Sequence, residues 1–274
     1  QLPQYNLRSA TLARCATGHD RPESAVTIAG IRTSIDVDSI IKDLGDFMVS
    51  YAADDWSDAY HHDFQYEVER VVERLSVMLR NQFGKWIRQL VIPTRSSAGK
   101  RLQSIDANGI FLTFNYTGTL REGYAVPDAH VLHIHGCADL EDDDLILGHA
   151  WNPQTRKSLN DREDIEEIDT RLMEANHILD TYFAATFKPS DQLIQRNRQF
   201  FDGLFDIQEV WVLGHSLSDV DEPYFKALLT VPSVSRACWS IACRSASDGS
   251  DKQDRLQELG VDATRIFPTS WDEM

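Results

Sequence analysis

Residues 110–117 read Ile-Phe-Leu-Thr-Phe-Asn-Tyr-Thr, a short apolar run that ends in polar residues. A run of this length between a glycine and an asparagine is typical of a strand that is buried in a parallel sheet. Other short apolar runs follow along the chain. They predict further strands at residues 130–134, 145–147, 210–213, 237–243 and 266–267.

Apolar residues at helical spacing predict helices between these strands. The predicted helices cover residues 35–51, 64–90, 165–187, 191–205, 224–229 and 252–259. The longest of them carries an apolar stripe through Val68, Val72, Leu75 and Leu79, which should pack on another helix. Residues 1–34 and 245–251 contain turn-forming residues and are predicted to be loops.

Strands that alternate with helices indicate parallel pairing with right-handed crossovers. We therefore expect an α/β fold with a Rossmann-like parallel sheet. In this interpretation residues 1–100 form a mainly helical segment packed on the core, and residues 101–274 form the α/β core. A helical insertion interrupts that core at about residues 160–205.

The composition disfavours several classes of protein. The 27 basic and 43 acidic residues give a formal net charge of −16, which repels polyanions and makes broad nucleic-acid binding unfavourable. The four cysteines contain no CxxC pair, so neither a disulfide framework nor a structural metal site is indicated. No apolar run is long enough for a membrane span and no signal peptide is recognisable, so a cytoplasmic protein is expected.

Polar residues follow three of the predicted strands, where ligands bind in parallel α/β sheets. The first strand is followed by Asn115 and Thr117, and the second ends in a segment that contains His133 and His135. The strand at 210–213 is followed by Gly214, His215, Ser216 and Asp221. We expect these three segments to meet at one edge of the sheet, with His149 lining the same pocket.

At these residues the sequence resembles the bacterial AbiH phage-defence family. Members carry an FNYT-type motif, an HIHG motif, an LGH motif and a GHSL-x-x-x-D-x-P-Y-F motif, in that order. Here the motifs stand at Phe114–Thr117, His133–Gly136, Leu147–His149 and Gly214–Phe225. The resemblance covers most of residues 54–230, including Trp56-Ser57-Asp58 and the long helix after it. It implies an abortive infection effector in antiviral defence, with a phage-derived trigger or partner protein and self-association as expected partners.

Family members open with a strand followed by a Gly-Asn-Gly-Phe-Asp turn, which is not found in this sequence. The segment Leu2-Pro3-Gln4-Tyr5 resembles what lies shortly after that turn. The resemblance therefore implies that the N-terminal strand and its glycine turn are missing. Such a turn at a helix N-terminus is a common site for a diphosphate.

The same layout more distantly resembles sirtuin-like NAD-binding domains. Asn115 matches the asparagine of their N-x-D motif, and His135 matches the histidine of their HG motif. Gly214 and Ser216 resemble their ribose-contacting GTSL segment. Thr117 replaces the motif aspartate and the zinc-binding CxxC pairs are missing, so protein deacetylation is not expected.

The resemblance implies NAD or a related nucleotide as ligand or substrate, and an NAD glycohydrolase as the corresponding enzyme. Cleavage of the nicotinamide–ribose bond needs a group that holds water or the sugar hydroxyls, and a base with a near-neutral pKa. Asn115 is suited to the first role and His135 to the second, because imidazole titrates near ~6.5. The residues expected to contact the ligand are Thr117, His133, His149, Gly214, His215, Ser216 and Asp221.

Structural roles compete with this interpretation. Asn115 could cap a helix that follows it, and Asp219 and Asp221 could cap the helix before which they stand. One of His133 and His135 would then be a hydrogen-bonded structural histidine. The histidines at 130, 133, 135, 149 and 215 could also bind a metal, but no H-E-x-x-H arrangement is present and no metal is expected.

Other reactions have weaker support. Ser216 lacks the second glycine of a G-x-S-x-G turn, which disfavours a serine hydrolase. Cys137 follows His135-Gly136 and could be a nucleophile, although buried cysteines without a reaction are more common. A nuclease is disfavoured by the acidic charge. The alternative to an enzyme is a nucleotide-sensing or protein-binding module without catalytic turnover.

Overall fold

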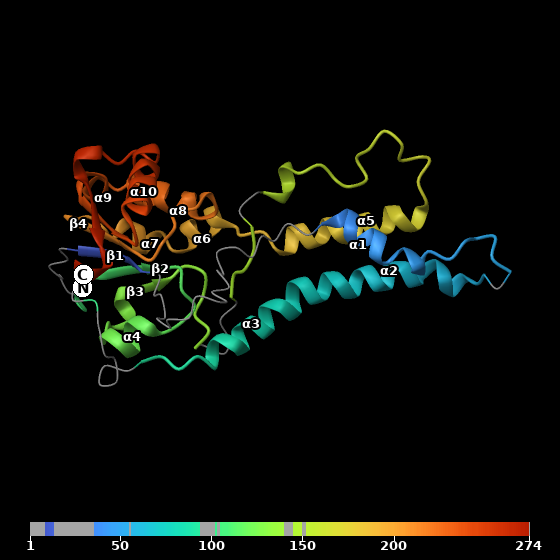
Figure 1. The fold of residues 1–274 in the computed structure, drawn as a ribbon, viewed down its shortest axis with the longest axis horizontal. Helices are drawn as coiled ribbons and strands as arrows, with labels where there is room; N and C mark the ends of the chain where they lie inside the picture. The colour runs from blue at the N-terminus through green and yellow to red at the C-terminus, as the bar shows by residue number, and fades with distance from the viewer. Residues whose placement is uncertain are drawn as a thin grey trace. The chain divides into compact units, whose positions relative to one another are not determined.

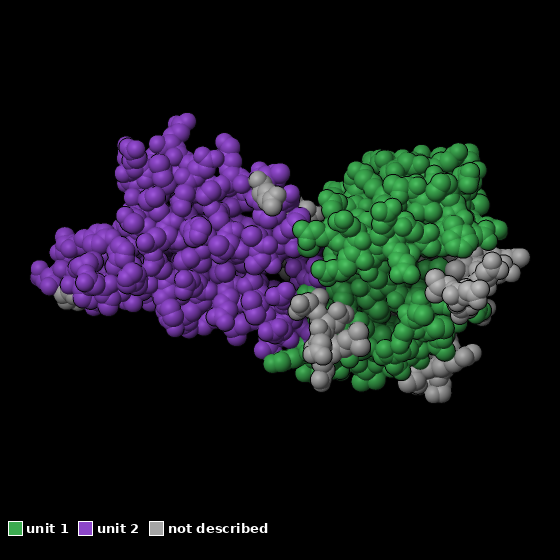
Figure 2. Space-filling view, turned by 180° about the vertical axis from the view of Figure 1, so that it is seen from behind, with its two compact units in different colours: residues 1–22, 85–145, 189–274 green, residues 23–84, 146–188 purple. Residues whose placement is uncertain are grey.

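The structure, a computed structural model, describes residues 9–13, 36–54, 56–93, 102, 105–139, 145–149 and 152–273. The chain divides into two compact units, which Figure 2 colours separately. Unit 1 contains β1 (Ser9–Ala13) and the described residues of 85–145 and 189–274. Unit 2 contains the described residues of 23–84 and 146–188. Each unit is therefore assembled from stretches that lie far apart in the sequence.

Unit 1 is built on a six-stranded parallel sheet with the order β3-β2-β1-β4-β5-β6 (Figure 1). Besides β1, its strands are β2 (Ile110–Thr113), β3 (Val131–His133), β4 (Glu209–Leu213), β5 (Cys238–Cys243) and β6 (Ile266–Ser270). The strands are rich in buried apolar residues such as Leu112, Val212 and Ile241. Burial on both faces by covering helices explains why these strands read as apolar runs. The α/β class predicted from the sequence is confirmed.

The first strand corrects the sequence analysis, which assigned residues 1–34 to a loop and considered the N-terminal strand missing. β1 lies in the middle of the sheet, with Leu12 in register with Leu112 of β2 and Val212 of β4. Its five residues, Ser-Ala-Thr-Leu-Ala, are too short and too polar to show a strand pattern. Residues 9–13 are a strand because they pair with β2 on one side and with β4 on the other. The segment Leu2–Tyr5 and the position of a glycine turn lie outside the described residues.

The prediction of a strand at residues 145–147 is wrong, because this apolar segment is not one of the strands of the described sheet. After it, His149 forms an isolated parallel bridge with Phe187. Gly148 has a φ of +151°, and a Cβ there would lie 1.7 Å from the carbonyl oxygen of Thr186. The LGH motif therefore allows a close approach of two backbones in unit 2.

Six helices of unit 1 surround the sheet or follow its strands in the described part of the chain. They are α4 (Thr119–Tyr124), α6 (Ser190–Arg196), α7 (Arg198–Asp202), α8 (Glu222–Leu229), α9 (Pro232–Arg236) and α10 (Ala246–Glu258). The short helical turns of this unit are η4 (Asp128–His130), η6 (Asp219–Asp221), η7 (Ala263–Arg265) and η8 (Trp271–Glu273). α8 and α9 each have a proline in the first turn, where its missing N–H costs nothing.

The predicted loop at residues 245–251 is wrong, because α10 already begins at Ala246. The Ser245 side chain caps this helix by accepting a hydrogen bond from the Asp248 N–H. The cap and the packing of α10 on β5 and β6 stabilise a polar segment that is a poor helix former in isolation.

Unit 2 is helical. Its elements are α1 (Val37–Asp43), η2 (Gly45–Phe47), α2 (Asp58–Glu73), the π-helical turn η3 (Arg74–Met78), η5 (Pro153–Thr155) and α5 (Thr170–Ala185). After η3 the helix continues as α3 (Leu79–Arg88), whose residues from Lys85 onward belong to unit 1. The long helix predicted for residues 64–90 is thus confirmed, with a π turn in its middle.

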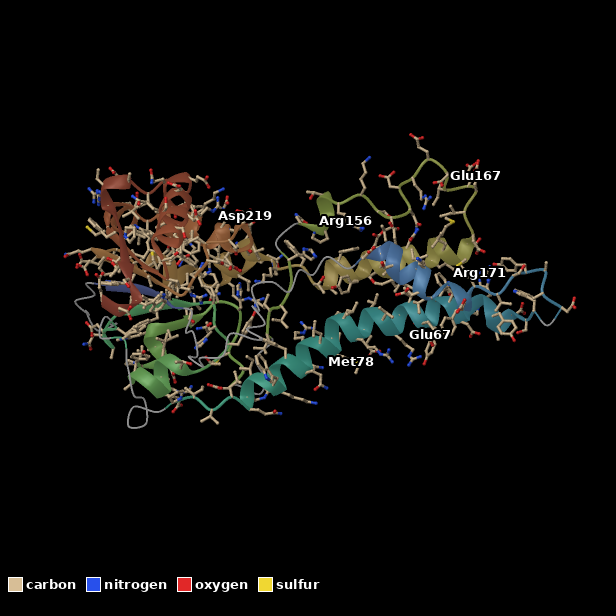
Figure 3. All side chains as sticks on the ribbon, in the orientation of Figure 1. Glu67, Met78, Arg156, Glu167, Arg171 and Asp219 are labelled. Atoms are coloured by element: carbon tan, nitrogen blue, oxygen red, sulfur yellow. The ribbon has the colours of Figure 1, made fainter. Side chains whose placement is uncertain are left out.

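The apolar stripe of the long helix packs on α5, which runs beside α2 (Figure 1). Phe64 and Val68 are fully buried against Ala175 and Leu179, with Val72 at the border of this core. The prediction of helix-to-helix packing is confirmed for this part of the stripe. Beyond the π turn, Leu79 is 38% exposed. Met78 lies on the side of the helix that is turned away from α5 (Figure 3).

This packing predicts the effect of trimming one valine on the long helix. We expect Val68→Ala to lower the free energy of unfolding by about 2 kcal/mol, because it removes two methyl groups from a fully buried position. Val77→Ala is the matched control, since Val77 is 44% exposed on the same helix and should change stability by less than about 0.5 kcal/mol. Denaturant unfolding of the full chain measures both. Equal losses would show that the stripe is not the buried face.

Candidate functional site

The residues singled out from the sequence in unit 1 follow β2, β3 and β4. The carboxyl ends of parallel strands lie at one edge of a sheet, and here the order of strands reverses at β1, with β2 on one side and β4 on the other. Ligands bind at such a reversal in open α/β sheets. His135 stands two residues after β3, and His215 stands two residues after β4.

A buried His–Asp–His cluster, made of His135, Asp221 and His215, forms at this edge. The three residues are only 1%, 2% and 1% exposed. Nε2 of His215 lies 3.3 Å from Oδ2 of Asp221, and Nε2 of His135 lies 3.9 Å from Oδ1. One buried carboxylate therefore faces two imidazoles from different strands. Buried charged groups are costly without such partners, which makes this cluster a candidate for function.

The hydrogen bonds of His215 identify its neutral tautomer. Its Nδ1 accepts a hydrogen bond of 2.8 Å from the backbone N–H of Leu217. The proton of the neutral ring therefore sits on Nε2, which faces Asp221. The turn that allows this bond has Gly214 and Leu217 at φ +66° and +55°. Leu217 is held there by a hydrogen bond of 3.2 Å from Nε of Arg255 on α10 to its carbonyl.

Tyr224 of α8 contacts His135 of the cluster and also Ser190. Its hydroxyl lies 3.2 Å from Nε2 of His135. Burial raises the pKa of Tyr224 to about 12, an effect that the Asp221 charge increases and a hydrogen bond with Ser190 opposes. Tyr224 is thus protonated at neutral pH and keeps a hydroxyl proton for hydrogen bonding.

The aromatic ring of Phe114 covers the cluster from β2. Its centroid lies 5.5 Å from that of His135 and 4.5 Å from that of His215. Phe114 also stacks on Phe225 with a centroid distance of 6.1 Å, and Phe225 lies 5.1 Å from His215. The first residue of the FNYT motif therefore provides an apolar wall, which lowers the local dielectric and strengthens the electrostatic interactions beside it.

Asn115 and His133 join the ends of β2 and β3. The Asn115 backbone N–H donates to Oγ1 of Thr113, and its carbonyl accepts a hydrogen bond of 2.9 Å from Nδ1 of His133. His133 therefore has a structural bond at one nitrogen and presents Nε2 as an acceptor. Thr117 pairs with Thr119 through their hydroxyls at 2.8 Å. Asn115, His133 and Thr117 are half-buried, in contrast to His135.

The capping roles considered for the Asn115 and Asp221 side chains are wrong. α4 has Gly118 at its N-cap, with no side chain capping it, so Asn115 does not fill that position. α8 has Asp221 at its N-cap, but the carboxylate makes no cap hydrogen bond.

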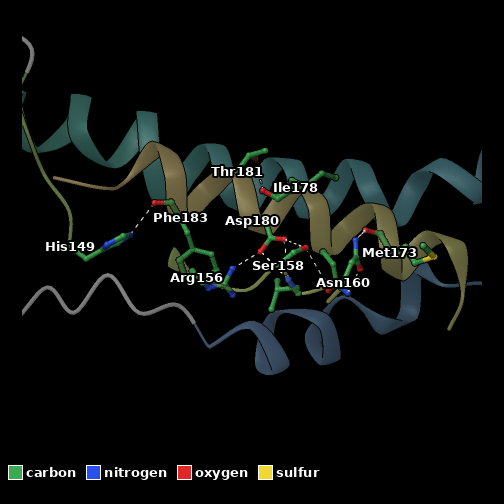
Figure 4. A network of polar contacts seen from close by, with 11 residues as sticks. His149, Arg156, Ser158, Asn160, Met173, Ile178, Asp180, Thr181 and Phe183 are labelled. Carbon is green, nitrogen blue, oxygen red and sulfur yellow. Dashed lines mark hydrogen bonds and ion pairs between the residues drawn. The ribbon is translucent and has the colours of Figure 1, made fainter. Parts of the chain in front are cut away.

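The remaining candidates are Ser216 and His149. Ser216 follows His215 but is exposed. His149 belongs to unit 2, where it is 5% exposed and its Nε2 donates to the Phe183 carbonyl at 3.1 Å (Figure 4). In the same unit Asp180 of α5 binds Arg156 and Ser158. His149 therefore makes a hydrogen bond to α5 within unit 2.

Sequence reasoning missed Tyr224, Ser190 and Arg255. Tyr224 could have been found, because it stands three residues after Asp221 and such a spacing places two side chains on one helical face. Ser190 and Arg255 lie too far from the motifs in the sequence for any spacing to indicate their contacts. Arg255 also binds Asp219 and Glu222, and the bonds from Lys226 and Arg255 hold the pKa of Glu222 below its usual range.

In the part of the chain that the structure describes, no three His, Cys, Asp or Glu side chains are grouped so that they could hold a metal ion. The helices in the described ranges are all too short or too polar to cross a membrane.

Comparison with known proteins identifies one matching family. A family model described as bacteriophage abortive infection AbiH matches residues 23–243. This range includes the FNYT, HIHG, LGH and GHSL motifs and extends through both units. No curated protein and no solved structure gives a significant match.

Proposed function

The chain belongs to the bacteriophage abortive infection AbiH family, and we propose that it acts in this defence through a nucleotide bound at the carboxyl edge of unit 1. The buried His–Asp–His cluster at that edge carries the proposal. A fold needs no such cluster to be stable, since apolar residues of similar volume stabilise a core as well or better. A phage-derived trigger and self-association remain predictions from the family resemblance.

The arrangement of strands supports a dinucleotide as the ligand. The order β3-β2-β1-β4-β5-β6 is the order found in Rossmann dinucleotide-binding domains. We accordingly propose a Rossmann-like, sirtuin-like fold for unit 1, with NAD or a related nucleotide across the strand ends. Asn115, Thr117, His133, Gly214 and Ser216 would contact it, because they stand at or after the strand ends and are more exposed than the cluster.

The proposed reaction is hydrolysis of the nicotinamide–ribose bond. Water adds to the ribose carbon, nicotinamide leaves with the bonding electron pair, and His135 takes up the proton of the water. Asp221, 3.9 Å from Nε2 of His135, would stabilise the imidazolium that forms. Tyr224 would orient the ring, and Phe114 would limit the access of other water.

Binding without turnover is the second candidate, and one observation favours it. His135 is 1% exposed, so it can meet a substrate water only if the surrounding side chains rearrange. A nucleotide sensor needs no such access. In that case the cluster would hold the β3 and β4 loops in the geometry that recognises the ligand.

One experiment separates the two functions. The full chain is incubated with NAD, nicotinamide release is followed by chromatography, and NAD binding is measured by calorimetry. Release together with binding supports the enzyme. Binding without release, also in extracts of phage-infected cells, supports the sensor. If NAD neither binds nor is consumed, the dinucleotide proposal is wrong.

A further inference from the structure

We propose that Arg255 of α10 is a positioning residue that keeps His215 neutral, so that His135 takes up the proton released in the reaction. This inference rests on the proposed function, because it decides which histidine of the His–Asp–His cluster acts as the base. Arg255 acts on His215 through the backbone of Leu217, in the turn that follows β4.

The distances to the Asp221 carboxylate would by themselves favour protonation of His215 over His135. Nε2 of His215 lies 3.3 Å from Oδ2 of Asp221, whereas Nε2 of His135 lies 3.9 Å from Oδ1. A nearby negative charge favours the protonated form of an imidazole, and the attraction grows as the distance falls. If His135 is to be the base, a further contact must keep the proton off His215.

The aromatic rings around the cluster oppose a charge on His215 but leave its ring nitrogens able to take up a proton. The centroids of Phe114 and Phe225 lie 4.5 Å and 5.1 Å from that of His215. Beside His135, the hydroxyl of Tyr224 is uncharged, because burial raises the pKa of Tyr224 to about 12. The rings and this hydroxyl therefore do not decide which imidazole accepts the proton.

The backbone N–H of Leu217 supplies the deciding contact. It donates a hydrogen bond of 2.8 Å to Nδ1 of His215. A protonated imidazole carries a hydrogen on both nitrogens and cannot accept this bond, so protonation of His215 would break it. Both residues are buried, where a backbone donor without a partner costs free energy. The bond therefore holds His215 in its neutral form, with the proton on Nε2.

Leu217 makes this bond in a backbone conformation that needs support. Its φ of +55° lies in the left-handed region, which is unfavourable for a residue with a side chain and persists only where the surroundings hold it. Nε of Arg255 donates a hydrogen bond of 3.2 Å to the Leu217 carbonyl. Arg255 thus fixes the carbonyl of the residue whose N–H fixes His215.

The ion pairs of Arg255 use other nitrogens of the guanidinium. Nη2 lies 2.6 Å from Asp219 and 2.5 Å from Glu222, and Nη1 lies 3.0 Å from Glu258. Carboxylates around a planar guanidinium fix its orientation, and here they leave Nε–H directed at Leu217. The bond to the turn can therefore be removed separately from the ion pairs.

Arg255→Lys removes the Nε bond, because lysine keeps the positive charge but has a methylene group where arginine has Nε–H. Nitrogen NMR of the full chain with isotope-labelled histidines, assigned with His215→Gln, reads the protonation of His215. About one pH unit below the ordinary imidazole pKa of about 6.5, the unmutated chain should show neutral His215 with its proton on Nε2. Arg255→Lys should show the doubly protonated ring. Nicotinamide release should fall about 10-fold or more, with a smaller change in NAD affinity.

Glu258→Gln is the matched control. It removes an ion pair of the same guanidinium and leaves the Nε bond in place, and Glu258 is 66% exposed. This variant should keep the wild-type His215 signal and the wild-type rate. The spectrum of the unmutated chain tests the inference even if Arg255→Lys fails to fold.

The outcomes distinguish this inference from the proposed function. A His215 signal that changes in Arg255→Lys, in a chain that releases no nicotinamide, supports the positioning role and contradicts the reaction. A doubly protonated His215 in the unmutated chain, or an unchanged signal or rate in Arg255→Lys, overturns the inference and leaves the reaction at His135 standing. Equal changes in Glu258→Gln also overturn it, because the ion pairs rather than the Nε bond would then hold the turn.

Discussion

Replacing His135 with glutamine is expected to lower nicotinamide release from NAD about 10²–10⁴-fold, the usual contribution of general acid–base catalysis. Glutamine can still hydrogen-bond the Tyr224 hydroxyl, which lies 3.2 Å from Nε2 of the native histidine, but it cannot take up a proton. NAD affinity should change much less than the rate, because a base acts mainly in the transition state. Turnover and binding are measured on the same preparation.

The matched control is His130→Gln, which makes the same change at the amino end of β3. His130 precedes the strand and lies near the Ala107 carbonyl, whereas His135 follows the strand at its carboxyl end. It should retain the wild-type rate. A wild-type rate in the His135 variant, with an unchanged thermal melt, would remove His135 from the mechanism. A loss of affinity equal to the loss of rate would instead assign it to ligand binding.

Replacing Asp221 with alanine should have the largest effect on stability. The carboxylate is 2% exposed and faces the Nε2 atoms of both buried histidines. Its removal leaves the His215 N–H without its carboxylate and frees the turn between β4 and α8. Leaving a buried donor without its charged acceptor costs about 1–3 kcal/mol, and we expect the free energy of unfolding to fall by at least this amount. Denaturant unfolding measures the change.

Asp219→Ala provides the comparison, two residues away in the same helical turn. Asp219 is 91% exposed and pairs with Arg255, and exposed ion pairs contribute about 0–1 kcal/mol. Its position on the surface of unit 1 is marked in Figure 3. A large loss for Asp221 and a small one for Asp219 would show that burial of the carboxylate, rather than its charge alone, stabilises the turn. A loss below about 1 kcal/mol for Asp221→Ala would contradict the central role of the cluster.

Much of the fold could be predicted from local patterns. The runs at 110–114, 130–134, 210–213 and 237–243 are strands within one or two residues, because burial on both faces requires continuous apolar sequence. The long helix was predictable because its stripe repeats over many turns. The motifs that follow the strands also placed His135, His215 and Asp221 in one neighbourhood before their geometry was known.

Three segments differ from their sequence prediction because their structure depends on contacts with distant parts of the chain. The run at 145–147 looks like a strand in the sequence, but it is not a strand of the described sheet, because strands are defined by pairing along the sheet. Residues 9–13 show no strand pattern, yet they lie between β2 and β4 and complete the sheet. The polar segment 245–251 joins α10 because Ser245 caps it and two strands pack against it.

The sequence by itself determined the α/β class, the helices with long periodic stripes and the polar segments that follow the strands, because these depend on residues close together in the chain. The structure alone decided which side chains meet. His135 and Tyr224 are 89 residues apart in the chain and share a hydrogen bond. His149 and Phe183 are 34 residues apart and share a hydrogen bond within unit 2. Contacts of this kind depend on the packing of whole elements, which no local periodicity encodes.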